Sequence, residues 1–235
     1  MTDAILFDCW GTLVDAPGLV SSGGKDRLFH KYLQDRGINL DFESFCNLFY
    51  STEIQKKGME ENREYSRYET QRQRLIQSLT AMGASYDQEL IEGLLDDYAE
   101  EWVKRSTLFP SAMDLLQKLR GKYRLGLITN ASDKDTTWRV LRNLRLKDLF
   151  ASIVISGEFG WRKPSPKIFN AALTELAVKP EYAVMVGDSF EADIIGANNL
   201  GMKTVYINAE NETRSDVPDI TIQHIEQLYD RLPEL

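Results

Sequence analysis

The sequence predicts an α/β fold, in which a doubly wound parallel sheet carries an inserted all-helical subdomain. Short apolar runs rich in Val and Ile alternate with helical periodicity in the second half of the chain. About 90 residues, from Pro17 to Arg105, separate the first such run from the second and contain no strand-like run. With 235 residues, of which 43% are hydrophobic, the chain is long enough for one domain with a large insert.

Five apolar runs are expected to form buried strands of the sheet. They are AILF (4–7), LGLIT (125–129), SIVIS (152–156), YAVMVG (182–187) and TVYI (204–207). Between the later runs, apolar residues three and four positions apart predict helices, one with Trp138, Leu141 and Leu144 and one with Ile168, Ala171, Ala172 and Leu176. Alternation of strand and helix gives a parallel sheet, whose ligand crevice lies at the carboxyl ends of the strands.

The inserted segment predicts four helices, each with one apolar face. The faces are Phe29, Tyr32 and Leu33; Phe42, Phe45, Cys46 and Phe49; Leu75, Leu79 and Met82; and Leu90, Leu94, Leu95, Tyr98 and Trp102. Breaks between the helices are indicated by Gly37 with Asn39, by Gly58, and by Gly83 with Ser85. We therefore expect a core domain of residues 1–15 and 106–235 and a helical cap domain of residues 16–105.

The charge and the apolar patterning favour small molecules as partners. The net charge is -8, from 36 acidic and 28 basic residues, which opposes binding to nucleic acid or to an anionic lipid surface. No apolar stretch reaches the roughly 18 residues that a membrane helix needs, and the start of the chain lacks the pattern of a signal peptide. We expect a cytoplasmic protein, a monomer or a homodimer, that binds a small anionic molecule.

Cysteines and histidines are too few for several classes of site. Cys9 and Cys46 form no CxxC pair, and we expect no disulfide between them. His30 and His224 are the only histidines, and we expect both to lie in solvated helices. They cannot supply a Ser-His-Asp triad, a Cys-His dyad or a zinc site. Catalysis would therefore depend on carboxylates, Lys, Thr, Ser or a hard metal ion.

Polar side chains follow the predicted strands at the edge where these strands end. The residues are Asp8 after the first strand, Thr129 and Asn130 at the end of the second, Lys163 after the third, and Asp188 after the fourth, with Asp193 one helical turn later. Buried carboxylates that meet at one place repel one another unless a cation neutralises them. Mg²⁺ is the natural candidate, because it binds carboxylates, waters and phosphate oxygens. Lys163 would hold both the substrate anion and the attacking carboxylate.

Four motifs in chain order resemble those of the haloacid dehalogenase (HAD) superfamily of hydrolases. They are DCWGTLVD (8–15), TN (129–130), KPSPKIF (163–169) and GDSFEAD (187–193). The resemblance spans nearly all of the core. It implies a Rossmann-like parallel sheet with a cap inserted after the first motif, where the helical insert of this chain lies.

The resemblance also implies a mechanism and a set of site residues. Asp8 is expected to attack the substrate and to form a covalent aspartyl intermediate that water then hydrolyses. The expected Mg²⁺ ligands are Asp8, the backbone carbonyl of Trp10 and Asp188, with Asp193 as a further ligand or as an orienter of Lys163. The expected binders of the substrate anion are Lys163, Thr129 and Asn130, assisted by a helix N-terminus and by the turn that Gly11 and Thr12 shape after the nucleophile.

Trp10 departs from the pattern of the superfamily's phosphatases, most of which carry a second aspartate two residues after the nucleophile. An indole is only a weak hydrogen-bond donor and cannot serve as a general acid or base. Because positioned proton transfer contributes roughly 10²–10⁴-fold, we do not expect efficient hydrolysis of simple alkyl phosphate monoesters.

Three functions remain open at this point. The first is a Mg²⁺-dependent small-molecule phosphohydrolase whose leaving group needs little protonation, or which recruits another acid such as Glu158. The second is a metal-free 2-haloacid dehalogenase, in which an aromatic residue also follows the nucleophile and halide leaves without a proton. The third is a non-catalytic binding pseudoenzyme. The retained Asp188 favours the phosphohydrolase, because dehalogenases usually lack that acid.

Overall fold

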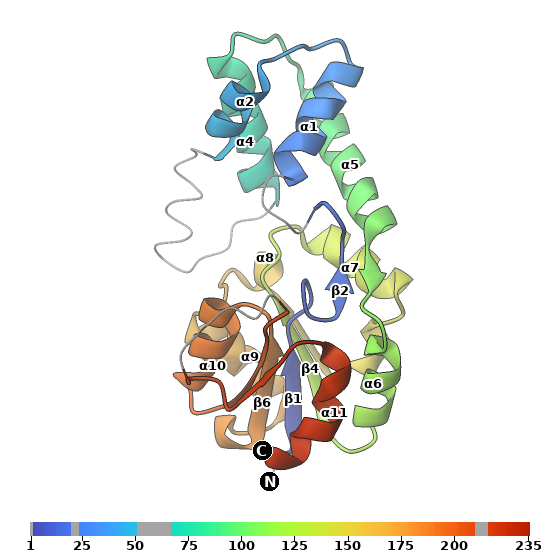
Figure 1. The fold of residues 1–235 in the computed structure, drawn as a ribbon. Helices are drawn as coiled ribbons and strands as arrows, with labels where there is room; N and C mark the ends of the chain where they lie inside the picture. Colours follow the sequence, from blue (N-terminus) through green and yellow to red (C-terminus); the bar gives the residue numbers. More distant parts are fainter. Residues whose placement is uncertain (1, 20–23, 51–66, 210–215) are drawn as a thin grey trace.

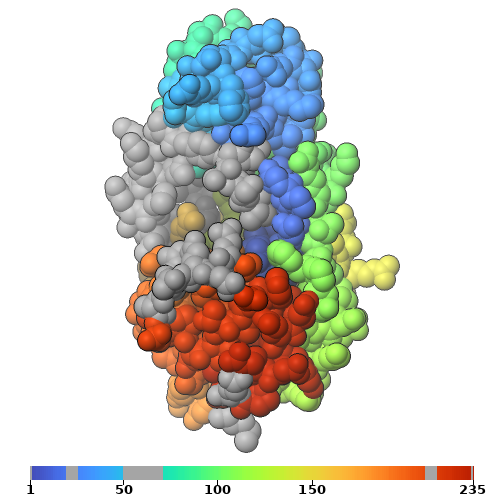
Figure 2. Space-filling view, viewed as in Figure 1, coloured from blue at the N-terminus to red at the C-terminus, as the bar shows by residue number. Residues whose placement is uncertain are grey.

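The computed structural model describes residues 2–19, 24–50, 67–209 and 216–235. A parallel sheet flanked by helices forms one part of the molecule, and a bundle of helices lies above one end of that sheet (Figure 1). In the space-filling view, α1 and α2 lie at one end of the molecule and the C-terminal part of the sheet domain at the other (Figure 2). No helix of the described segments is both long enough and apolar enough to cross a membrane.

The sheet has six strands, and every neighbouring pair of them is parallel. In spatial order they are β5 (Ser152–Ile155), β4 (Arg124–Thr129), β1 (Ala4–Phe7), β6 (Ala183–Gly187), β7 (Lys203–Ile207) and β8 (Ile220–Ile222). The predicted α/β fold class and the five predicted strands are confirmed. β8 was not predicted, because its three residues are too short to show a pattern.

β1 lies in the middle of the sheet, and its four residues are fully buried. Ile5 and Phe7 point into one hydrophobic cluster, whereas Ala4 and Leu6 point into the cluster on the opposite face. A strand that is buried on both faces is apolar along its whole length. This is why AILF is an unbroken apolar run rather than an alternating one.

Helices cover both faces of the sheet, as a doubly wound fold requires (Figure 1). Helices α6 (Ala112–Leu119), α7 (Lys134–Asn143) and α11 (Leu228–Arg231) contribute to the cluster that contains Phe7. Helices α9 (Pro166–Leu176) and α10 (Gly196–Asn198) contribute to the cluster that contains Leu6. The shorter helical elements are α8 (Ser156–Phe159), η1 (Lys147–Leu149), η2 (Pro180–Tyr182), the π-helical η3 (Phe190–Ile195), η4 (Ile225–Gln227) and η5 (Leu232–Glu234).

The described part of the insert contains α1 (Gly24–Asp35), α2 (Phe42–Tyr50), α4 (Arg67–Ala81) and α5 (Gln88–Arg105). Their apolar faces meet in a third hydrophobic cluster. The predicted breaks at Gly37 and Gly83 are confirmed, and both glycines have a positive φ, at 78° and 69°. The predicted break at Gly58 lies outside the described residues.

Two short strands connect the insert to the sheet domain. β2 (Val14–Asp15) pairs in antiparallel fashion with β3 (Thr107–Leu108). α5 extends from the helical bundle to the side of the sheet domain (Figure 1) and ends at Arg105, where Ser106 alone separates it from β3. The domain boundaries that we predict, 15/16 and 105/106, lie next to this pair of strands.

The structure corrects one expectation and confirms another. His30 was expected to be solvated, but its side chain is buried in the cap, where Nε2 lies 2.8 Å from the carbonyl oxygen of Leu40. The prediction was wrong because the segment after α1 folds back over this helix and buries the imidazole. Cys9 and Cys46 are free thiols, as expected.

Candidate active site

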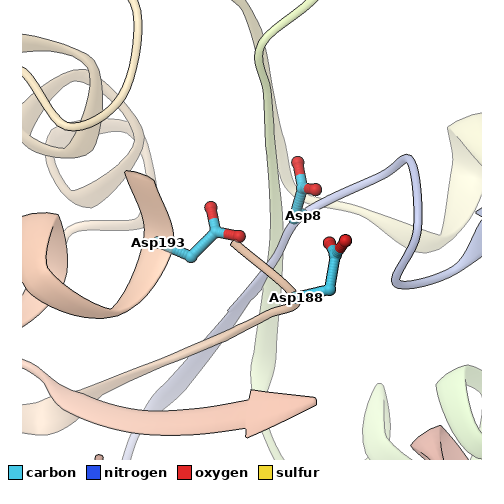
Figure 3. Close-up of side chains that lie close together, drawn as sticks. All are labelled: Asp8, Asp188 and Asp193. Carbon is cyan, nitrogen blue, oxygen red and sulfur yellow. The ribbon is translucent and has the colours of Figure 1, made fainter. Parts of the chain in front are cut away.

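Three carboxylates converge at the carboxyl ends of the central strands (Figure 3). Asp8 follows β1, Asp188 follows β6, and Asp193 lies on the π-helical turn η3. One oxygen from each side chain lies within 4.8 Å of the others. In Figure 3, the carboxylates of Asp8 and Asp188 lie side by side, and the carboxylate of Asp193 points toward them. The register explains this meeting, because Phe7 pairs with Val186 and places Asp8 level with the end of β6.

Lys163 is buried beside these acids. Its Nζ lies 2.6 Å from Oδ1 of Asp8 and 2.6 Å from Oδ1 of Asp193. It also donates a hydrogen bond of 2.9 Å to the carbonyl oxygen of Ile128. The contact with Asp193 is an ion pair rather than a hydrogen bond, because Oδ1 of Asp193 has no hydrogen-bond partner among the described residues. Lys163 therefore orients Asp8 through a hydrogen bond and faces Asp193 as a buried charge.

The electrostatics of the cluster are dominated by burial and by excess negative charge. Burial raises the pKa of Asp8, Lys163 opposes this rise, and Asp188 adds to it. Burial and the charge of Asp193 likewise raise the pKa of Asp188. Burial raises the pKa of Asp193 to about 6 against the opposing effect of Lys163. Burial alone would lower the pKa of Lys163, but the charges of Asp193 and Asp8 outweigh it and raise that pKa.

Three carboxylates and one ammonium leave the cluster short of positive charge. Asp8 and Asp188 offer hard oxygen donors, of the kind that Mg²⁺ prefers. A divalent cation between them would neutralise the repulsion that raises their pKa values. The residues present therefore fit a magnesium ion.

The two carboxylate oxygens of Asp193 have different surroundings. Oδ1 forms an ion pair with Lys163 but has no hydrogen bond among the described residues, and Oδ2 accepts a hydrogen bond of 3.0 Å from the backbone N–H of Ser189. The carboxylate lies against Gly187, where a Cβ atom would overlap it. These contacts suit the orientation of Lys163 better than direct coordination of a metal ion.

Gly11 and Thr12 contact Asp188. Gly11 has a φ of 83°, and a Cβ atom at this position would overlap the carboxylate of Asp188. The hydroxyl of Thr12 donates a hydrogen bond of 3.0 Å to Oδ1 of Asp188, and Thr12 is buried. The turn after the nucleophile therefore leaves room for Asp188 and holds it in place.

Thr129 and Asn130 lie in different surroundings. Thr129 is fully buried, and its Oγ1 has no hydrogen-bond partner among the described residues. The side chain of Asn130 spans the backbone of Lys163: Nδ2 donates to the carbonyl oxygen at 3.0 Å, and Oδ1 accepts from the N–H at 2.8 Å. The hydroxyl of Thr129 thus has no partner within the described protein, whereas the amide of Asn130 positions the loop of Lys163.

The N-terminus of α7, which we expected to assist anion binding, carries its own cap. Oδ1 of Asp133 accepts a hydrogen bond of 3.1 Å from the N–H of Thr136, and Oδ2 accepts one of 2.6 Å from its hydroxyl. The N–H of Ala131 donates to Oγ of Ser156 at 2.9 Å. An anion at this helix end would have to share these donors.

Trp10 turns its ring toward the cap. Its centroid lies 4.7 Å from that of Trp102 on α5, with an interplanar angle of 75°. Glu158, the candidate substitute acid, accepts a hydrogen bond of 3.0 Å from Nε1 of Trp138 and is not part of the carboxylate cluster found among the described residues.

The sequence did not show several contacts of this site. The carbonyl of Ile128 and the N–H of Ser189 are backbone groups, which carry no residue-specific signal. Trp102 was predicted only as a packing residue of a helix face, because its position opposite Trp10 depends on the tertiary fold.

Comparisons with known proteins point to one family. A family profile described as haloacid dehalogenase-like hydrolase matches residues 2–201. A glyceraldehyde 3-phosphate phosphatase of Methanopyrus kandleri is 30% identical over 242 residues, which cover 100% of this chain and 99% of that protein. Another, of Methanothermobacter thermautotrophicus, is 32% identical over 213 residues, with 89% and 87% coverage. A solved structure of a 2-haloacid dehalogenase from Pseudomonas syringae is 25% identical, with a TM-score of 0.77 and 99% coverage of both chains.

Proposed function

Because the chain belongs to the haloacid dehalogenase-like hydrolases, we propose that it is a Mg²⁺-dependent phosphohydrolase of small anionic molecules, with Asp8 as its nucleophile. The observation that carries the proposal is the contact of Asp8 with both Lys163 and the acid cluster. One oxygen of Asp8 lies 2.6 Å from Nζ of Lys163, and the carboxylate of Asp188 lies beside that of Asp8 (Figure 3). Dehalogenase chemistry releases halide without a metal ion and has no need of the acid at position 188.

In the proposed reaction, the carboxylate of Asp8 attacks the phosphorus atom of the substrate. A bond forms between a carboxylate oxygen and phosphorus, and the bond from phosphorus to the leaving oxygen breaks. Water then attacks the phosphorus of the aspartyl phosphate, which releases phosphate and restores Asp8. Lys163 keeps the nucleophile oriented and charged, and the hydroxyl of Thr129, which has no partner among the described residues, would donate to the transferring group.

Asp8, Asp188 and the backbone carbonyl of Trp10 would hold Mg²⁺, which when bound supplies positive charge for the phosphoryl oxygens. Asp193 would keep Lys163 in place through its 2.6 Å contact rather than act as a ligand. Thr12 would orient Asp188 through its hydrogen bond of 3.0 Å.

Trp10 limits the leaving groups that this site would process well. An indole donates no proton to a departing alkoxide, and Glu158 is bound to Trp138. We propose that substrates with stable leaving groups, such as acyl or aryl phosphates, react faster than alkyl phosphates. The names of two relatives refer to glyceraldehyde 3-phosphate, so this alkyl phosphate is the relevant comparison.

A turnover assay tests the proposal. The substrates are p-nitrophenyl phosphate, acetyl phosphate, glyceraldehyde 3-phosphate and L-2-chloropropionate, each with Mg²⁺ and with a chelator. We expect release of phosphate that requires Mg²⁺ and that is fastest from the first two. Release of chloride in the presence of chelator would instead establish a dehalogenase, which the aromatic residue at position 10 and the similarity to a 2-haloacid dehalogenase favour. Release of neither phosphate nor chloride from any of the four substrates would indicate a non-catalytic binding protein.

A further inference from the structure

Trp10 links the loop of the nucleophile to the cap. It follows Asp8 by two residues, and it packs both against the hydrophobic cluster of the sheet domain and against that of the cap. Its contact in the cap is the indole of Trp102 on α5, at 4.7 Å and in an edge-to-face arrangement. This geometry is one that aromatic pairs prefer, because the positive edge of one ring meets the negative face of the other.

The aromatic contacts continue from Trp102 into the cap. Tyr98 lies one helical turn earlier on α5, and its ring centroid is 6.1 Å from that of Trp102. The ring of Tyr98 stacks on Phe29 of α1 at 4.8 Å. A chain of ring contacts therefore connects position 10 with two of the cap helices.

The loop that carries Trp10 leaves little freedom for independent movement. The N–H groups of Leu13 and Val14 both donate to the carbonyl of Cys9, at 2.9 and 2.8 Å, and the N–H of Gly11 donates to the carbonyl of Val14 at 2.9 Å. The hydroxyl of Thr12 holds Asp188. A displacement of the Trp10 ring is therefore transmitted to the backbone beside Asp8 and to the acid opposite it.

A second contact anchors α5 to the sheet domain, but it is exposed. Nη2 of Arg139 on α7 lies 2.6 Å from Oε1 of Glu100, with side-chain exposures of 39% and 67%. Solvent screens such a pair, so it holds the helix only weakly. α5 also packs against α7, and its Val103 packs against the cluster of the sheet domain, whereas the half-buried indole pair is a contact of α5 that reaches the loop of the nucleophile.

From these contacts we infer that Trp102 is a positioning residue of the reaction, which acts through Trp10 to couple the placement of the cap to the geometry of Asp8. The inference rests on the proposed function. The indole at position 10 then occupies the place of the missing acid. It cannot transfer a proton, but it contacts the cap through Trp102.

Turnover of p-nitrophenyl phosphate by the full chain tests the coupling. Trp102→Ala is expected to lower kcat between about tenfold and a hundredfold, with KM changed much less, because small displacements near a reacting group have effects of this size. Trp102→Phe keeps an aromatic edge and is expected to restore kcat to within about threefold of wild type. Trp102→Leu replaces the alanine variant if that variant does not fold.

Two controls separate positioning from loss of stability. Phe45→Leu changes the same cap cluster at a ring that contacts His30 and Phe49, and it is expected to lower Tm but not kcat. Trp10→Ala combined with Trp102→Ala is expected to be no slower than the slower single variant, because each change removes the same ring contact. A wild-type kcat in Trp102→Ala, or a kcat that follows Tm in Phe45→Leu as well, would overturn the inference.

A spectroscopic measurement is independent of turnover. Two indoles in contact give an exciton couplet in far-ultraviolet circular dichroism, which Trp10→Phe and Trp102→Phe should each abolish. A wild-type spectrum without this couplet overturns the inference even if the enzyme is active. Absence of all turnover in a wild type that shows the couplet would count against the proposed function and leave the indole contact established.

Discussion

Nζ of Lys163 lies 2.6 Å from Oδ1 of Asp8, and both side chains are buried at the carboxyl end of the central strand. The two residues are 155 positions apart in the chain. Lys163 also contacts Asp193, so one buried ammonium group faces two of the three carboxylates in the cluster. The stability of the site, its affinity for a metal ion and its reactivity all depend on this balance.

Removal of the Lys163 charge should damage both stability and activity. Lys163→Met keeps the length of the side chain but leaves Asp8 and Asp193 buried without their partner, which costs about 3–5 kcal/mol in comparable pairs. We expect a decrease of this size in the free energy of unfolding in urea and a loss of turnover. Lys167→Met is the control, because Lys167 is exposed and its ammonium group lies over the ring of Trp161. Its unfolding free energy should change by less than about 1 kcal/mol.

Mg²⁺ should stabilise the protein through Asp188. A ligand present at about 100 times its Kd raises the free energy of unfolding by about 2.7 kcal/mol, and we expect a corresponding rise in Tm. Asp188→Asn should abolish this rise. It should not lower Tm in the absence of metal, because it removes a charge whose repulsion raises the pKa of Asp8. Asp230→Asn, which removes an exposed acid on α11, should leave the effect of Mg²⁺ intact.

Two glycines with similar backbone conformations should respond differently to substitution. Gly11 and Gly201 have φ values of 83° and 77°, so alanine costs about 1–2 kcal/mol of backbone strain at either position. At Gly11 the new Cβ also collides with Asp188, whereas at Gly201 it meets nothing within 4 Å. Gly201→Ala should therefore lower Tm and keep kcat, while Gly11→Ala should lower both. Equal kcat values for the two variants would show that the contact with Asp188 does not matter.

Asp219 should contribute stability that depends on pH. Burial raises its pKa, but hydrogen bonds from Lys203 and from the N–H of Thr204, at 2.8 and 2.9 Å, outweigh this effect and lower it. Because the pKa is lower in the folded state, the stabilisation is complete above the ordinary value of 3.8 and is lost as the pH falls through the folded value. Because solvent screens this exposed pair, Asp219→Asn should cost at most about 1 kcal/mol at pH 7 and progressively less below pH 3.8 in urea titrations. A cost that does not change with pH would contradict this assignment.

The strands were predictable from the sequence because each is an apolar run that ends at Gly, Asp or another polar residue. β1 matches its predicted range, and the other four predicted strands differ from theirs by one residue at most. β8 was missed because Ile220–Ile222 is short and one of its three residues is exposed. His30 was misjudged because its burial depends on where the chain returns after α1, which no local pattern shows.

The site was predictable only as a set of residue types at one edge of the sheet. The parallel topology brings Asp8, Lys163 and Asp188 to that edge whatever their side chains do there. The sequence could not show how hydrogen bonds are distributed among them. That the amide of Asn130 holds the loop of Lys163, and that the hydroxyl of Thr12 holds Asp188, follows from side-chain orientations that only the folded chain determines.

The nucleophilic role of Asp8 is the central claim, and trapping of the covalent intermediate tests it most directly. The enzyme is quenched with acid during turnover of acetyl phosphate with Mg²⁺, and the peptide that contains Asp8 is examined by mass spectrometry. The account predicts that this peptide gains the mass of one phosphoryl group, and that Asp8→Asn shows neither the adduct nor turnover. Turnover by Asp8→Asn at the wild-type rate, or a phosphoryl group found on another residue instead, would contradict it.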